Sequence, residues 1–164
     1  MNQLEIVKNL TKWMTEFIEV PSPKLGAWAP CPFARQARVN NNISIKFAEV
    51  FEFDDVINES LEILEHKEVV VVCFDHNTID PISLQDYVKE KNDWLLPINY
   101  VILEDHPGTP EYINDVCMNF GECGLLVIQK LDKLNKASDQ LREKGYYDPW
   151  TQSDLDSVVS WRYK

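Results

Sequence analysis

A cysteine and two arginines stand close together in the segment that follows the first predicted helix. Cys31 lies between two prolines, and Arg35 and Arg38 come shortly after it. Because proline is favoured in the first turn of a helix, the segment predicts Cys31 at a helix N-cap and Pro32 as the first helical residue. The positive end of a helix and nearby guanidinium groups both favour the reactive thiolate. Cys31 is therefore the candidate nucleophile, with Arg35 and Arg38 as candidate binding groups for an anionic substrate.

The tetrapeptide from Cys31 to Ala34 is similar to the Cys-Pro-Phe/Tyr-Cys motif of glutaredoxin-like and disulfide-forming oxidoreductases. Ala34 stands where those proteins have their second cysteine, and the residues before the motif form a poor strand. We therefore do not expect a dithiol oxidoreductase. The alternative interpretation is that this loop packs against the core and that Cys31 has no chemical role.

Two Asp-His pairs follow predicted strands. Asp75 and His76 come directly after the apolar run 69–74, and Asp105 and His106 follow a strand that begins at Tyr100. Ligands of open α/β sheets bind outside the carboxyl ends of parallel strands, so parallel strands would bring both pairs to one edge. There His106 would act as a base, Asp105 would orient an imidazole, and His76 would bind substrate.

The same four side chains also define where a divalent metal such as Zn, Mn or Fe would bind. We expect no resident cofactor. The competing interpretation of Asp75, His76, Asp105 and His106 is structural, because Asp, His and Pro are ordinary residues of the loops that follow strands.

Charge and hydropathy restrict the partners. Asp and Glu number 27 against 16 Lys and Arg, so the formal net charge is −11, which disfavours binding to phosphate backbones. No apolar run reaches the ~20 residues of a membrane span, and the first residues lack a secretory signal. We expect a cytoplasmic protein with neither nucleic-acid nor membrane partners.

The order of predicted elements indicates an α/β layered sandwich formed by a single domain over residues 1–164. The runs 69–74 and 125–128 are apolar throughout, as in central strands, whereas 43–47 alternates like a strand buried on one face. The four-stranded sheet is expected to be mostly parallel or mixed, with the direction of the last two strands open. Helices are predicted over 4–18, from Asp54, from Ser83 to Trp94, from Thr109 to Val116, from Asp132 to Gly145, and from Thr151 to Val159.

Over about residues 28–112 the chain resembles an uncharacterised family of small bacterial proteins. The resemblance rests on Cys31-Pro32-Phe33-Ala34 and on the later His106-Pro107. The family's Arg-rich C-terminal motif has no counterpart here. Because the family has no known activity, the resemblance implies Cys31, Arg35 and His106 as site positions and implies no reaction.

Two functional hypotheses follow from these residues. The first is a small enzyme-like or small-ligand-binding protein, whose cleft at strand C-terminal ends joins Cys31, Arg35, His76 and His106 around a small anionic ligand. The second is a non-catalytic interaction protein that binds another protein through its acidic surface or through the aromatic cluster at 146–150. The sequence does not distinguish an enzyme from a binding protein.

Overall fold

The computed structural model describes residues 1–164 and is organised around a four-stranded sheet. The strand order is β1 (Ile43–Phe47), β2 (Val69–Phe74), β6 (Gly124–Lys130) and β3 (Tyr100–Asp105). β1 and β2 are parallel, whereas β6 runs antiparallel to both of its neighbours. The predicted α/β class and four strands are confirmed, and the sheet is mixed. The C-terminal ends of β1, β2 and β3 consequently all lie at the same end of the sheet.

The two strands predicted to be central are central. β2 and β6 lie between the edge strands, and their side chains alternate between two apolar layers. Val70 and Val72 pack with α3 (Phe53–Ile63) and α4 (Pro81–Leu95) on one face of the sheet. Val71 and Cys73 pack with α1 (Gln3–Trp13) on the other. A strand that is covered on both faces has no solvent-facing positions, which is why its sequence is apolar throughout.

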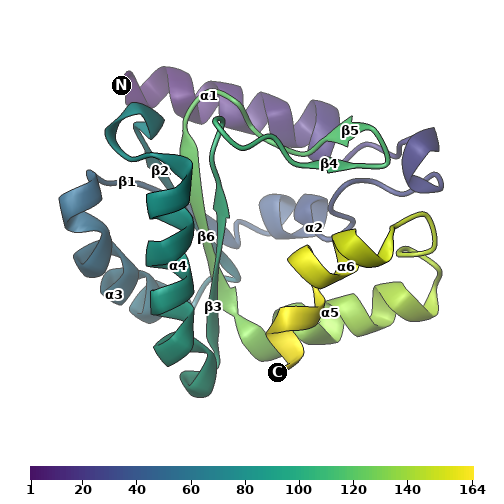
Figure 1. Cartoon of the computed structure of the whole chain (residues 1–164). Helices are drawn as coiled ribbons and strands as arrows, with labels where there is room; N and C mark the ends of the chain where they lie inside the picture. Colours follow the sequence, from purple (N-terminus) through teal and green to yellow (C-terminus); the bar gives the residue numbers. More distant parts are fainter.

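The remaining helices lie on the side of the sheet away from α3 and α4 (Figure 1). They are α2 (Ala34–Val39), α5 (Leu131–Glu143) and α6 (Gln152–Val158). A π-helical turn, Met14–Ile18, extends α1 and completes the first predicted helix. No helix is long and apolar enough to cross a membrane. Short 3-10 turns cover Pro23–Leu25, Val50–Glu52, His76–Thr78, Leu96–Ile98 and Ser160–Tyr163.

The helix predicted from Thr109 is wrong. This segment forms a small hairpin of β4 (Tyr112–Ile113) and β5 (Val116–Cys117). Its turn consists of Asn114 and Asp115, with φ of 50° and 67°. Asn and Asp tolerate this left-handed conformation better than most residues, and a two-residue hairpin turn requires it. The turn residues therefore override the helix-start signal of Thr109-Pro110.

Two predicted helix starts are also shifted. α4 begins at Pro81 rather than at Ser83, because the Asp80 carboxylate caps it and accepts a hydrogen bond from the Ser83 N–H at 3.0 Å. α3 begins at Phe53, so Asp54 lies in its first turn and does not cap it. In both cases an acidic residue still sits at the positive end of the helix, where its charge is favourable.

Candidate functional site

The two histidines of the Asp-His pairs lie at the same end of the sheet, where β2 and β3 finish. β2 and β3 run in the same direction because each is antiparallel to β6 between them. The imidazole rings of His76 and His106 are consequently close, with centroids 5.9 Å apart and planes nearly perpendicular. The predicted placement of both imidazoles close together, beyond the C-terminal ends of these strands, is confirmed. Their predicted chemical roles stay predictions.

His106 is buried, and both of its ring nitrogens have partners. The Gly108 N–H donates to Nδ1 at 2.9 Å, so Nδ1 is an acceptor and the ring hydrogen is on Nε2. Nε2 then donates to the carbonyl of Ile79 at 2.8 Å and, less directly, to that of His76 at 3.1 Å. These bonds join the end of β3 to the loop that follows β2. His106 therefore acts as a structural bridge, and neither ring nitrogen is free to meet a substrate.

The aspartates beside the histidines also hold loops. Asp75 accepts hydrogen bonds from the N–H and the side-chain amide of Asn77, both at 3.0 Å, and they lower the pKa of its carboxyl. Asp105 accepts from the side-chain amide of Asn119 at 2.7 Å and from the N–H of Phe120 at 2.9 Å. No group of three or more His, Cys, Asp or Glu side chains is arranged to hold a metal ion.

Cys31 does not cap a helix, which corrects the sequence-based placement. α2 begins three residues later, at Ala34, and the Cys31 N–H donates to the carbonyl of Ile18 at 3.1 Å. Although the residue is exposed as a whole, burial around its sulfur raises the pKa of the thiol. The N–H groups of Phe33 and Ala34 oppose that rise and are outweighed. The helix N-cap predicted for Cys31 is therefore wrong, the raised pKa disfavours the predicted thiolate, and no hydrogen bond links Cys31 to His76 or His106.

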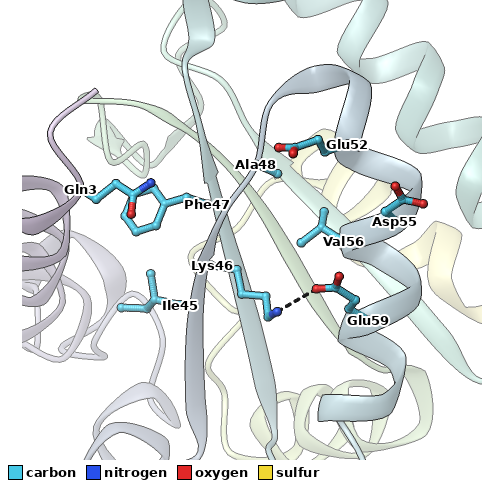
Figure 2. Close-up of a pocket in the computed structure, with 9 residues that line it drawn as sticks. All are labelled: Gln3, Ile45, Lys46, Phe47, Ala48, Glu52, Asp55, Val56 and Glu59. Atoms are coloured by element: carbon cyan, nitrogen blue, oxygen red, sulfur yellow. Dashed lines mark hydrogen bonds and ion pairs between the residues drawn. The ribbon is translucent and has the colours of Figure 1, made fainter.

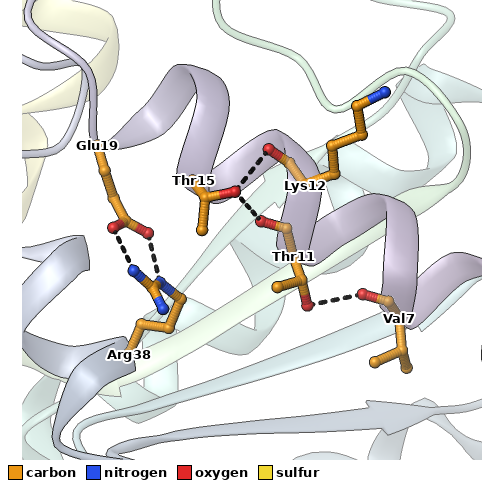
Figure 3. A network of polar contacts seen from close by, with 6 residues as sticks. All are labelled: Val7, Thr11, Lys12, Thr15, Glu19 and Arg38. Carbon is orange, nitrogen blue, oxygen red and sulfur yellow. Dashed lines mark hydrogen bonds and ion pairs between the residues drawn. The ribbon is translucent and has the colours of Figure 1, made fainter.

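The two arginines differ in their surroundings. Arg38 makes a two-point ion pair with Glu19, with Nε–Oε2 at 2.7 Å and Nη2–Oε1 at 2.9 Å (Figure 3). The side chain of Glu19 is only 5% exposed, so this pair neutralises a buried charge. The Nε and Nη2 groups of Arg38 are consequently engaged by Glu19. Arg35 is exposed on α2 and has no ion-pair partner.

The aromatic cluster at 146–150 holds the Pro-rich loop in place. Tyr146 is buried, and its hydroxyl donates to the carbonyl of Pro30 at 2.5 Å. Its ring packs edge-on against Trp28, with centroids 5.8 Å apart, and against Tyr147 and Trp150 of the cluster. These aromatic rings therefore pack mainly against one another and against Trp28. This packing favours a structural role for the cluster over a role as a contact surface for another protein.

A pocket opens beside the end of β3, and two of the predicted site residues, Asp105 and His106, line it. This β3 pocket has a volume of about 470 Å³ and is bounded by the start of α4, the 104–111 segment, the 118–119 segment and the C-terminal helices. Carboxyl groups of Glu104, Asp105 and Glu111 line it, together with Met118 and Trp161. No Lys or Arg lines it.

The three carboxyl groups of the β3 pocket share one electrostatic property. Partial burial raises the pKa of Glu104, Asp105 and Glu111, since water is removed from their charged forms, although Glu104 and Asp105 are only half-buried and Glu111 is exposed as a whole residue. For Glu111 the negative charges of Asp105, Glu104 and Asp154 raise the pKa further. For Asp105 the hydrogen bonds from Phe120 and Asn119 oppose part of this rise in pKa. The carboxylates of Glu104 and Glu111 accept no hydrogen bond from another residue.

Only part of the β3 pocket could have been found from the sequence. Glu104 directly precedes the Asp105-His106 pair, and an acidic residue at the end of an otherwise apolar strand is a signal that the sequence offered. Trp161 and Glu111 reach the pocket only through the fold, from segments with no local motif.

Comparison with protein-family models, with curated proteins and with solved structures finds no match to this chain.

Proposed function

We propose that this protein binds a small organic cation, an amine or a guanidinium compound, in the β3 pocket. The observation that supports it is the convergence of Glu104, Asp105 and Glu111 on one pocket that no Lys or Arg lines. A volume of about 470 Å³ lies within the usual range of roughly 300–1,000 Å³ for small-molecule sites. An anionic ligand, expected from the sequence, would instead meet like charge there.

A bound cation would relieve the two effects that raise the carboxyl pKa values. It would replace part of the lost hydration, and it would offset the repulsion among the three carboxylates. Charge-assisted hydrogen bonds of this kind contribute about 1.5–3 kcal/mol each. Asp105 is held by Asn119 and Phe120, whereas Glu104 and Glu111 have unused acceptor oxygens. These two glutamates are therefore the groups that we expect to contact the ligand.

The apolar part of the pocket suits an organic cation. Trp161 lines the pocket, and its indole N–H is fixed by donation to the carbonyl of Ser157 at 3.0 Å. Cations are attracted to the face of an indole ring, and Met118 adds a polarisable side chain beside it. In this proposal His106 is a positioning residue, because it ties the pocket-lining loop after β3 to the loop after β2.

Isothermal titration calorimetry with agmatine tests the proposal, since this compound carries both an amine and a guanidinium group. Succinate serves as the matched anionic probe and is expected not to bind. Glu104→Gln removes one charge while keeping the shape, and we expect it to weaken agmatine binding about tenfold. Glu143→Gln, at an exposed position at the end of α5, is the control and should change nothing.

The pH dependence has a defined sign. Affinity should fall as pH decreases through the raised pKa values of the pocket carboxyls, because protonated carboxyls no longer attract a cation. The proposal is contradicted if agmatine does not bind, if the Glu104→Gln variant binds it equally well, or if succinate binds in preference. Binding of Mg²⁺ or Ca²⁺ alone would also contradict the organic ligand.

A further inference from the structure

The outer edge of β1 presents backbone groups without partners. The Val69 N–H donates to the carbonyl of Asn42, and the Ala48 N–H donates to the carbonyl of Cys73. In a parallel pair these bonds alternate along the strand, so the even-numbered residues of this segment face β2. The N–H and C=O groups of Ile43, Ile45 and Phe47 therefore point away from the sheet. No side chain or other backbone group bonds to them.

The opposite edge of the sheet is treated differently. On β3, the side-chain amide of Asn92 donates to the carbonyl of Ile102 and accepts from its N–H, both at 2.9 Å. Asn92 is buried and imitates a neighbouring strand at that position. Proteins commonly block edge strands in such ways, because an open edge pairs readily with another chain. β1 has no equivalent of Asn92.

A groove of about 420 Å³ runs along the open edge of β1. Figure 2 shows its two sides: Ile45 and Phe47 project toward α1, whereas Lys46 projects toward α3. The α3 side is acidic, because Glu52, Asp55 and Glu59 line it. Lys46 pairs with Glu59 at 2.9 Å, which leaves two carboxylates in excess.

We propose that this β1 groove docks an extended segment of a partner protein, whose residues alternate between apolar and basic. The added strand would pair with the unpaired groups of Ile45 and Phe47. Its apolar side chains would face Ile45 and Phe47, and its Lys or Arg side chains would face Asp55 and Glu52. This surface is separate from the β3 pocket, since β1 and β3 are the two edges of the sheet.

A second copy of this chain fits the groove poorly. Antiparallel pairing of two β1 strands would place the α3 helices of both copies on the same face. The carboxylates of Glu52, Asp55 and Glu59 would then oppose one another, which is unfavourable at close range. Charge complementarity thus selects a basic partner strand over self-association.

Fluorescence anisotropy with a labelled, end-capped peptide of alternating lysine and valine tests the proposal. We expect binding that is lost for the peptide with glutamate in place of lysine. A lysine–valine peptide that is N-methylated at every residue has no backbone N–H on either edge, so it cannot donate to β1 and its binding should be lost too. Asp55→Lys should weaken binding of the unmodified peptide about tenfold, whereas Asp93→Lys, at an exposed position on α4, should leave it unchanged.

Circular dichroism establishes that both variants are folded. The proposal is overturned if the lysine–valine peptide does not bind, if the N-methylated or the glutamate peptide binds equally well, or if Asp55→Lys has no greater effect than Asp93→Lys. Concentration-dependent dimerisation through β1 that the lysine–valine peptide does not disrupt would point to a second copy and would likewise overturn it.

Discussion

Replacement of His106 by alanine separates a structural from a chemical role for this residue. The imidazole receives the Gly108 N–H at 2.9 Å and donates to the Ile79 carbonyl at 2.8 Å and the His76 carbonyl at 3.1 Å. His106→Ala removes all of these partners at once. A residue that serves only chemistry at the surface would leave the free energy of unfolding almost unchanged when it is replaced.

The expected loss follows from the contacts. A typical hydrogen bond contributes about 1 kcal/mol net, and a buried polar group left without a partner costs about 1–3 kcal/mol. Nδ1 accepts one hydrogen bond, and Nε2 donates one hydrogen bond that is shared between two carbonyls. The substitution therefore removes about two hydrogen bonds and the packing of a side chain that is 7% exposed. We therefore expect His106→Ala to lower the free energy of unfolding by about 2–4 kcal/mol.

Urea unfolding followed by circular dichroism measures this loss, with the denaturant slope checked for a common unfolded state. His76→Ala is the matched control, because it removes the ring that packs against His106 but keeps the backbone carbonyl. We expect less than about 1 kcal/mol for the control. A loss below about 1 kcal/mol for His106→Ala itself would refute the structural role.

Three further changes have directions set by the structure. Arg38→Ala should lower the urea midpoint of unfolding, because the side chain of Glu19 is only 5% exposed and loses its counter-ion. Glu19→Gln in the same background should recover part of the loss. Gly124→Ala should cost about 2–4 kcal/mol, since a Cβ there would lie 2.1 Å from the Phe74 ring; Phe74→Leu should reduce the cost. The free energy of unfolding of the unmodified protein should fall as pH rises through the raised pKa of Glu104. Glu104→Gln should therefore be more stable, relative to the unmodified protein, toward pH ~7. This difference should disappear below about pH 4.

The sequence predicted the parts of the fold that depend on local pattern. The runs 69–74 and 125–128 identified the central strands, because a strand covered on both faces has to be apolar at every position. Pairing direction was left open, since the same apolar run fits a parallel or an antiparallel neighbour. The helix predicted from Thr109 failed because the turn at Asn114 and Asp115 was overlooked.

The candidate site was harder to predict for a physical reason. His106 and His76 could be placed together, because strand direction alone determines which edge a strand end reaches. Their hydrogen-bond partners could not, since the carbonyls that receive Nε2 belong to a loop whose path the sequence does not reveal. Cys31 was misplaced because Pro32 supports a turn as readily as a helix start. The β3 pocket joins Glu104 to Trp161, and no local motif connects them.

The two proposed sites lie at opposite edges of the sheet, separated by β2 and β6, and this arrangement predicts that they act independently. Substitutions at distant positions without shared partners usually add in free energy. Glu104→Gln should therefore weaken agmatine binding without affecting the lysine–valine peptide, and Asp55→Lys should do the reverse. Saturating agmatine should also leave the peptide affinity unchanged. If either variant weakens both ligands equally, the acidic surface attracts cations without a defined site, and the geometry of the β3 pocket and of the β1 groove would explain neither interaction.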